Sequence, residues 1–201
     1  MSDLSKAPFH ERHSQLLETI SSGRFLKMQG LGNEVPFFIC PFSPDEKNEF
    51  VDDVYKPLIK NLAQNGVTVL ETGLYTLAID LMRKRGRWED VITKEPQLSK
   101  DELRELLQGI LDPEAHLIPA IAQKMAEQEF DVLFIHEVGE VYPYIRSHTV
   151  LNNLQSVAKD HPTVMFFPGA YTQSAEEGAA LELFGRINGD KYYRAFNIYH
   201  V

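Results

Sequence analysis

Four short apolar runs, separated by helix-like segments, constrain the fold more than any other feature of this sequence. Three of them are apolar on both faces: "VPFFICPF" at 35–42, "DVLFI" at 131–135 and "TVMFFPG" at 163–169. The fourth is "VTVLETG" at 67–73. Strands that are apolar on both faces must be covered by helices on both sides, which is typical of parallel sheets with crossover connections. The pattern predicts a three-layer α/β fold with a mainly parallel sheet flanked by helices.

The segments between these runs have helical periodicity and recognisable ends. A helix is predicted at 10–22 with Gly23 as its stop. Ser43 and Glu46 have the spacing of a capping box, as do Ser99 and Glu102. The remaining predictions are a helix over 43–65 kinked near Pro57, a helix through Leu74 and Leu81, helices within 99–129 with a cap at Asp112, a helix capped by Ser147, and a C-terminal β-hairpin turning at Asn188-Gly189.

Length and composition bound the class of protein. At 201 residues with 43% hydrophobic residues, we expect one α/β domain over 1–201, with an N-terminal helix in 1–24 and a helical segment at 99–129. No apolar run approaches the ~20 residues that cross a bilayer. The N-terminus lacks the apolar centre of a signal peptide, and Cys40 is the only cysteine. These features predict a cytoplasmic protein with no membrane contact, no disulfide and no cysteine-based zinc site.

The formal net charge of −9 argues against nucleic acid as a direct partner of the isolated chain, because DNA binding draws its strength from Lys and Arg. One basic cluster stands out, "MRKRGRW" at 82–88, in which Gly86 is well placed to end a helix. Cations in the last turn of a helix complement its dipole. We therefore interpret the cluster as a solvated helix end.

Ligands of open parallel sheets bind beyond the carboxyl ends of the strands. In this sequence, 41–43, 71–73, 136–140 and 168–171 follow those ends. The apolar strand that ends in His136-Glu137 resembles the segment that holds magnesium in P-loop NTPases. However, "PFSPDEKNEF" after the first strand has no glycine and is rich in acid, so the phosphate cradle is missing. The expected fold is P-loop- or Rossmann-like without a phosphate-binding loop.

Two further kinds of catalytic site have weak support. His136, Glu137, Glu140 and His148 could ligate zinc or manganese, but their spacing is not that of an H-E-x-x-H helix, and His148 is interpreted as structural. Ser147 has no nucleophile elbow and is interpreted as a helix cap. Cys40 is interpreted as an inert core thiol. No catalytic residue, metal or cofactor is predicted.

The polar stretch from 136 to 154 is interpreted as a junction that holds the fold and a partner together. Its carboxylates are expected to pair with arginines if the C-terminal hairpin packs beside them. Tyrosine and arginine often anchor protein interfaces. The candidate partner-binding or structural junction residues are Glu137, Glu140, Tyr142, Tyr144, Arg146, Asn152, Asn153, Tyr171, Arg186 and Arg194.

Four segments together resemble the BrxB family of BREX bacteriophage-exclusion systems. They are "FLKMQGLGNEVPFFICPF" at 25–42, "VGEVYPYIRSHTVLNNL" at 138–154, "TVMFFPG" at 163–169 and "LFGRINGDKYYRAF" at 183–196. The resemblance covers most of the chain and implies a core component of an anti-phage system. It also implies neighbours: a methyltransferase, a large ATPase, and the phosphatase-like protein PglZ as the favoured direct partner. It supplies no catalytic residues.

Two functions follow as hypotheses. The leading one is a non-catalytic assembly or adaptor protein of a BREX anti-phage defence system. The alternative is a degenerate nucleotide-binding or metal-dependent hydrolase domain that is active only within the complex. Whether the chain forms a homodimer stays open.

Overall fold

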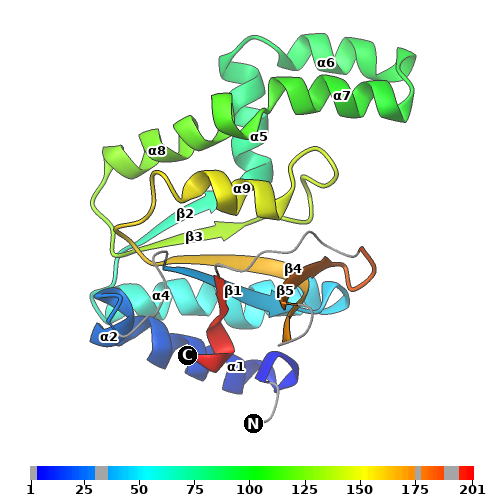
Figure 1. Ribbon diagram of the computed structural model, residues 1–201. Helices are drawn as coiled ribbons and strands as arrows, with labels where there is room; N and C mark the ends of the chain where they lie inside the picture. Colours follow the sequence, from blue (N-terminus) through cyan, green and yellow to red (C-terminus); the bar gives the residue numbers. More distant parts are fainter. Residues whose placement is uncertain (1–3, 30–35, 175–177, 188–194) are drawn as a thin grey trace.

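A six-stranded sheet runs through the part of the protein that the computed structural model describes, residues 4–29, 36–174, 178–187 and 195–201 (Figure 1). Its strand order is β2-β3-β4-β1-β6, and β5 pairs with β4. Every strand pair is parallel except β4 with β5. The predicted mainly parallel sheet is therefore confirmed. The strands are β1 (Phe37–Phe42), β2 (Val69–Gly73), β3 (Val132–His136), β4 (Thr163–Ser174), β5 (Gly178–Leu183) and β6 (Ala195–Asn197).

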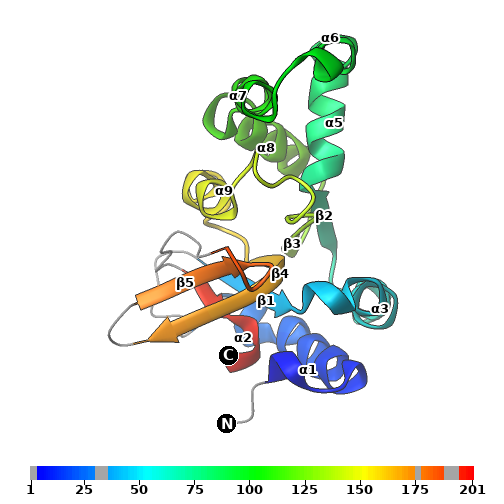
Figure 2. The same ribbon diagram turned by 90° about the vertical axis from the view of Figure 1, so that its right-hand side faces the viewer.

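Both faces of the sheet are buried under helices, which confirms the three layers. In β1, Phe37 and Ile39 point into one core, whereas Phe38 and Cys40 point into the other. This alternation follows from the period of two along a strand. α1 (Phe9–Ser21) and α4 (Lys56–Gln64) cover the Phe38 face. α5 (Leu74–Lys84), α8 (Ile118–Glu127) and α9 (Ser147–Leu154) cover the Phe37 face (Figure 2).

α1 matches the helix predicted at 10–22, but Gly23 is not simply the stop of this helix. Gly23 begins a second helix, α2 (Gly23–Leu26), whose N-cap is Ser22. The Ser22 hydroxyl accepts a hydrogen bond from the Phe25 N–H at 3.2 Å. The chain therefore turns at the expected place because a local cap starts a new helix there.

The segment after β1 is helical but differs from the prediction at its start. Ser43 makes no side-chain capping bond, and the Glu46 carboxylate accepts a hydrogen bond from the buried Arg12 guanidinium at 3.2 Å. The capping box predicted here is therefore wrong. α3 (Lys47–Phe50) leads through a π-helical turn at Val51–Tyr55 into α4. This irregular turn ends just before Pro57, near the predicted kink.

The helices between β2 and β3 largely follow their sequence signals. α7 (Lys100–Ile110) begins with the predicted reciprocal capping box of Ser99 and Glu102. Asp112 caps the next helical segment by accepting from the Ala115 N–H at 2.7 Å. α5 ends before Gly86, whose φ of 65° suits a glycine, so the basic cluster is a helix end as predicted.

α6 (Trp88–Lys94) was not predicted, and with α7 it forms an arm that stands away from the sheet (Figures 1 and 2). None of the helices within the described ranges is long and apolar enough to cross a membrane.

The C-terminal strands pair differently from the predicted hairpin. β4 is longer than the predicted 163–169, and from Gly169 onward it pairs antiparallel with β5. A Cβ at Gly169 would lie 2.1 Å from the Glu182 carbonyl oxygen, so this close approach requires glycine. β6 instead joins β1 in parallel. The turn predicted at Asn188-Gly189 lies outside the described residues. The cap predicted at Ser147 is wrong, because α9 begins at Ser147 and lacks a side-chain capping bond.

Candidate functional site at the carboxyl edge of the sheet

A pocket of about 560 Å³ lies at the carboxyl edge of the sheet, where the sequence analysis placed a candidate site. The chain leaves β1 through α3 toward one face and leaves β3 through α9 toward the other. Such a switch point is where open α/β sheets usually bind ligands. The apolar wall includes Phe42, Phe50, Tyr55, Phe166 and Pro168, and the polar lining includes Lys47, Glu71, His136, Glu137 and Glu140.

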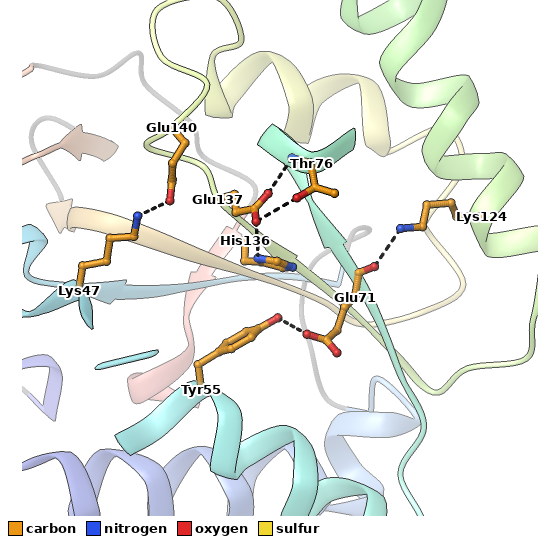
Figure 3. A network of polar contacts seen from close by, with 8 residues as sticks. All are labelled: Lys47, Tyr55, Glu71, Thr76, Lys124, His136, Glu137 and Glu140. Atoms are coloured by element: carbon orange, nitrogen blue, oxygen red, sulfur yellow. Dashed lines mark hydrogen bonds and ion pairs between the residues drawn. The ribbon is translucent and has the colours of Figure 1, made fainter. Parts of the chain in front are cut away.

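Glu137 uses both carboxylate oxygens to hold the start of α5 (Figure 3). Its Oε2 accepts from the Thr76 N–H at 2.8 Å, and its Oε1 accepts from the Thr76 hydroxyl at 3.1 Å. The first N–H groups of a helix have no partner within the helix, and its dipole favours an anion there. The N-cap residue of α5 is Gly73, which has no side chain to supply that partner. Glu137 is thus a distant N-terminal cap.

Two backbone features make room for this cap. Glu137 has a φ of 57°, in the left-handed region that ordinary side chains rarely adopt. A Cβ on Gly73 would lie 2.4 Å from the Glu137 Oε2. The carboxylate therefore reaches the helix because residue 73 is glycine and residue 137 accepts an unfavourable backbone conformation.

His136, which is half-buried, and Tyr55, which is buried, form the least exposed polar part of the site. Their ring centroids lie 5.3 Å apart, and the Tyr55 hydroxyl donates to Glu71 Oε2 at 2.8 Å. Burial lowers the pKa of His136 below its ordinary value, although nearby carboxylates, Glu137 first among them, oppose this shift. Burial and the hydrogen bond to Glu71 raise the pKa of Tyr55. A neutral imidazole and a neutral phenol are therefore expected near pH 7.

Glu140 and Lys47 form an ion pair that joins the loop after β3 to α3 (Figure 3). The lysine and glutamate side chains are 46% and 29% exposed, so solvent weakens their attraction. With Glu137 bonded to Thr76, both carboxylates have partners other than arginine. The pairing of these carboxylates with Arg146 or Arg186 stays a prediction, and Arg194 lies outside the described residues.

The other candidate junction residues fall into different environments. Tyr171 lies in the core, and its hydroxyl donates to the Ala195 carbonyl at 2.6 Å, which makes it a structural residue. Asn153 donates to the Thr149 carbonyl within α9 at 2.8 Å. Tyr142 and Tyr144 are half-buried against the core, whereas Arg146, Asn152 and Arg186 are exposed.

The residues of the alternative catalytic sites also have local partners. His148 Nε2 lies 3.1 Å from the Thr149 hydroxyl at the start of α9. Across the described ranges, no three His, Cys, Asp or Glu side chains gather closely enough to hold a metal ion. Cys40 is fully buried, which raises its pKa to about 12.

Sequence reasoning missed four side chains that complete the site: Lys47, Tyr55, Thr76 and Lys124. Lys124 of α8 donates to the Glu71 carbonyl at 3.2 Å. One signal could have pointed to Thr76, because a helix whose N-cap is glycine needs an acceptor from elsewhere. No comparable signal existed for Lys47, Tyr55 or Lys124, since each reaches the site from a different helical segment.

Fold and site together define an open-sheet α/β protein in which a helix N-terminus at the carboxyl edge of the sheet is capped by the protein's own Glu137 carboxylate. Sequence comparisons give the family: the chain belongs to the BrxB family. The family model described as "BREX protein BrxB" matches residues 70–198. A BREX protein BrxB of Bacillus cereus (strain H3081.97) is 32% identical over 94% of this chain and 96% of its own length. A BREX protein BrxB of Escherichia coli O9:H4 (strain HS) is 29% identical over 93% of this chain and 90% of its own length. No solved structure matches.

Proposed function

We propose that this protein is a non-catalytic component of a BREX phage-defence system, an assembly factor that holds other BREX proteins in place. Membership of the BrxB family supports the system. PglZ is the proposed direct partner, with the methyltransferase and the large ATPase as further partners. Because phage DNA enters the cytoplasm, we propose that the protein acts there.

The position of Glu137 carries the non-catalytic part of the proposal. In α/β proteins that act on nucleotides, the N-terminus of a helix at the carboxyl edge binds phosphate through its free N–H groups. Here the Glu137 carboxylate bonds to that end of α5. A bound phosphate would have to displace this carboxylate and would lie close to its negative charge. The arrangement therefore favours a structural edge over phosphate chemistry.

Charge reversal at the edge tests the adaptor role. Glu140→Lys should abolish phage defence and co-purification of BREX partners from the protein's own operon, and Arg146→Glu should do the same independently. The matched control is the swap Lys47→Glu with Glu140→Lys, which restores an ion pair within the protein. We expect the swap to restore thermal stability without restoring partner binding. If defence fails while the variants fold and retain every partner, the adaptor role is wrong.

The size of the edge pocket favours a second candidate function, a degenerate nucleotide-binding or metal-dependent hydrolase domain that is active only in the complex. Its volume of about 560 Å³ falls within the ~300–1,000 Å³ of small-molecule sites. Titration of the assembled complex and of the isolated chain with Mg-ATP separates the candidates. Turnover of a phosphorylated substrate by the folded protein, lost in Glu137→Gln, would support the hydrolase and end the assembly interpretation.

A further inference from the structure

A second concave surface lies beside the arm formed by α6 and α7 and shares Glu140 with the edge pocket. We call it the arm groove and define it by Tyr75 and Ile79 of α5, Trp88 and Ile92 of α6, Leu103 of α7, and Tyr144 of the loop after β3. Its volume is about 200 Å³. This is below the ~300 Å³ at which sites for whole small molecules begin. The groove is therefore sized for apolar side chains of another protein.

The groove exposes apolar side chains that a folded chain normally covers. Tyr75 is 48% exposed and Ile92 is 44% exposed, and these are the two most exposed large hydrophobic side chains in the described ranges. Trp88 and Tyr144 are half-buried beside them. Tyrosine and tryptophan dominate the energetic centres of protein interfaces. Clustered exposed apolar residues of this kind mark an interaction surface.

Charge identifies the partner. The two charged residues that line the groove are Glu95 and Glu140, both carboxylates. Lys47 engages Glu140, whereas Glu95 is exposed. Arg83 lies over the Trp88 ring at 5.2 Å, outside the lining. A second copy of this chain is disfavoured because each copy has a formal charge of −9. A positively charged partner complements both the carboxylates that line the groove and the negative net charge of the chain.

We propose that the arm groove binds an amphipathic helical segment of a partner protein that has Lys or Arg beside its apolar face. Helix-in-groove recognition uses apolar anchors on one face of the ligand helix, and flanking charges set its specificity. The proposal rests on the adaptor function, for which it supplies a surface and a partner chemistry. Tyr75, Trp88 and Ile92 contact the apolar face of the partner helix, and Glu95 attracts its cations.

Trp88 is the single tryptophan of the chain and lines the groove, so its fluorescence reports occupancy. The probes are two synthetic, tryptophan-free amphipathic helices with the same leucine face, one flanked by lysines and the other by glutamates. We expect the full-length protein to bind the lysine peptide at least about tenfold more tightly than the glutamate peptide. Added salt should narrow that difference. Equal affinities, or a preference for the glutamate peptide, would overturn the proposal.

Substitutions locate the binding surface. Ile92→Arg and Tyr75→Arg should each weaken binding of the lysine peptide by at least about tenfold. Val201→Arg is the matched control, because Val201 is 43% exposed and lies outside the groove. All three positions are exposed, so circular dichroism should show folded variants. Ile92→Arg and Tyr75→Arg variants that bind as tightly as Val201→Arg would count against the groove.

Co-purification from the native operon separates this proposal from the adaptor function itself. If the Ile92→Arg variant no longer co-purifies with BREX partners while the Val201→Arg variant still does, the proposed binding site in the arm groove is supported. If the unmodified protein brings down partners and Ile92→Arg keeps them all, the groove proposal fails and the adaptor function stands. If the unmodified protein brings down none, the adaptor function fails. A dimer seen in sedimentation that Ile92→Arg disrupts would assign the groove to a second copy and overturn the heterologous partner.

Discussion

The capping role of Glu137 predicts a measurable loss of stability in Glu137→Ala. The change removes both acceptors of Thr76. Loss of an N-terminal cap costs about 1 kcal/mol, and loss of a negative charge at a helix N-terminus costs about 0.3–1 kcal/mol more. The Glu137 side chain is 27% exposed, so water replaces part of what is lost. The expected decrease in the free energy of unfolding is about 1–2 kcal/mol.

Glu137→Gly separates the cap from the backbone strain. Glycine also removes the carboxylate, but it adopts the φ of 57° at this position without the cost of about 1 kcal/mol that an L side chain meets there. Glu137→Gly should therefore be about 1 kcal/mol more stable than Glu137→Ala. Urea unfolding followed by circular dichroism measures both values. An alanine variant as stable as the unmodified protein would refute the cap, and equal stability of the two variants would refute the strain.

Two further predictions extend this reasoning to pH and to thiol chemistry. Burial lowers the pKa of His136 below 6.5, so the imidazole takes up a proton more readily in the unfolded chain than in the folded one. The contribution of His136 to stability is therefore complete above about pH 6.5 and is lost as the pH falls toward the folded-state pKa. His136→Asn should therefore flatten the decline of the urea midpoint between about pH 7 and pH 5. Cys40 is fully buried and its pKa is raised to about 12. A thiol reagent should therefore label Cys40 no faster than the protein unfolds, and rapid labelling of the folded protein would contradict the burial of this thiol.

Gly73 and Glu137 should be energetically coupled, because a Cβ at residue 73 would displace the carboxylate. Gly73→Ala should cost about 1 kcal/mol more in the unmodified protein than in the Glu137→Ala background, where the added Cβ still meets the His136 Cε1 at 2.9 Å. Gly109→Ala is the matched control, since its Cβ would meet nothing within 4 Å in α7 and should stabilise the helix. Additive effects of the Gly73 and Glu137 changes in urea unfolding would show that the carboxylate has another role.

The elements that could be predicted from the sequence are those whose cause is local. Strands apolar on both faces can only lie in a covered sheet, so β1 and β3 were predictable. The Ser99–Glu102 capping box formed because both partners lie within one helical turn. The same spacing at Ser43–Glu46 failed because the buried Arg12, from α1, takes the glutamate. A local signal is thus overridden where a buried charge needs a partner.

The position of the candidate site could also be predicted, since it follows from the direction of the strands. Its hydrogen-bond partners could not. Glu137 and Thr76 lie 61 positions apart, and Lys47 and Glu140 lie 93 apart. Arginines looked like natural partners for the carboxylates because charge alone does not say which element packs nearby. The path of the chain through the helices decides these pairs, and periodicity does not determine that path.

The placement of Glu137 also connects the two surfaces of the protein. Thr76, which it caps, follows Tyr75, the first aromatic residue of the arm groove, in the opening turn of α5. Glu140, which follows Glu137 by three residues, lines both the edge pocket and the arm groove. The short loop after β3 therefore positions the groove relative to the sheet through one cap and one ion pair. An assembly factor needs a fixed connection of this kind between its sheet and its binding surface, whereas an edge that binds phosphate needs helix N–H donors left free for its substrate.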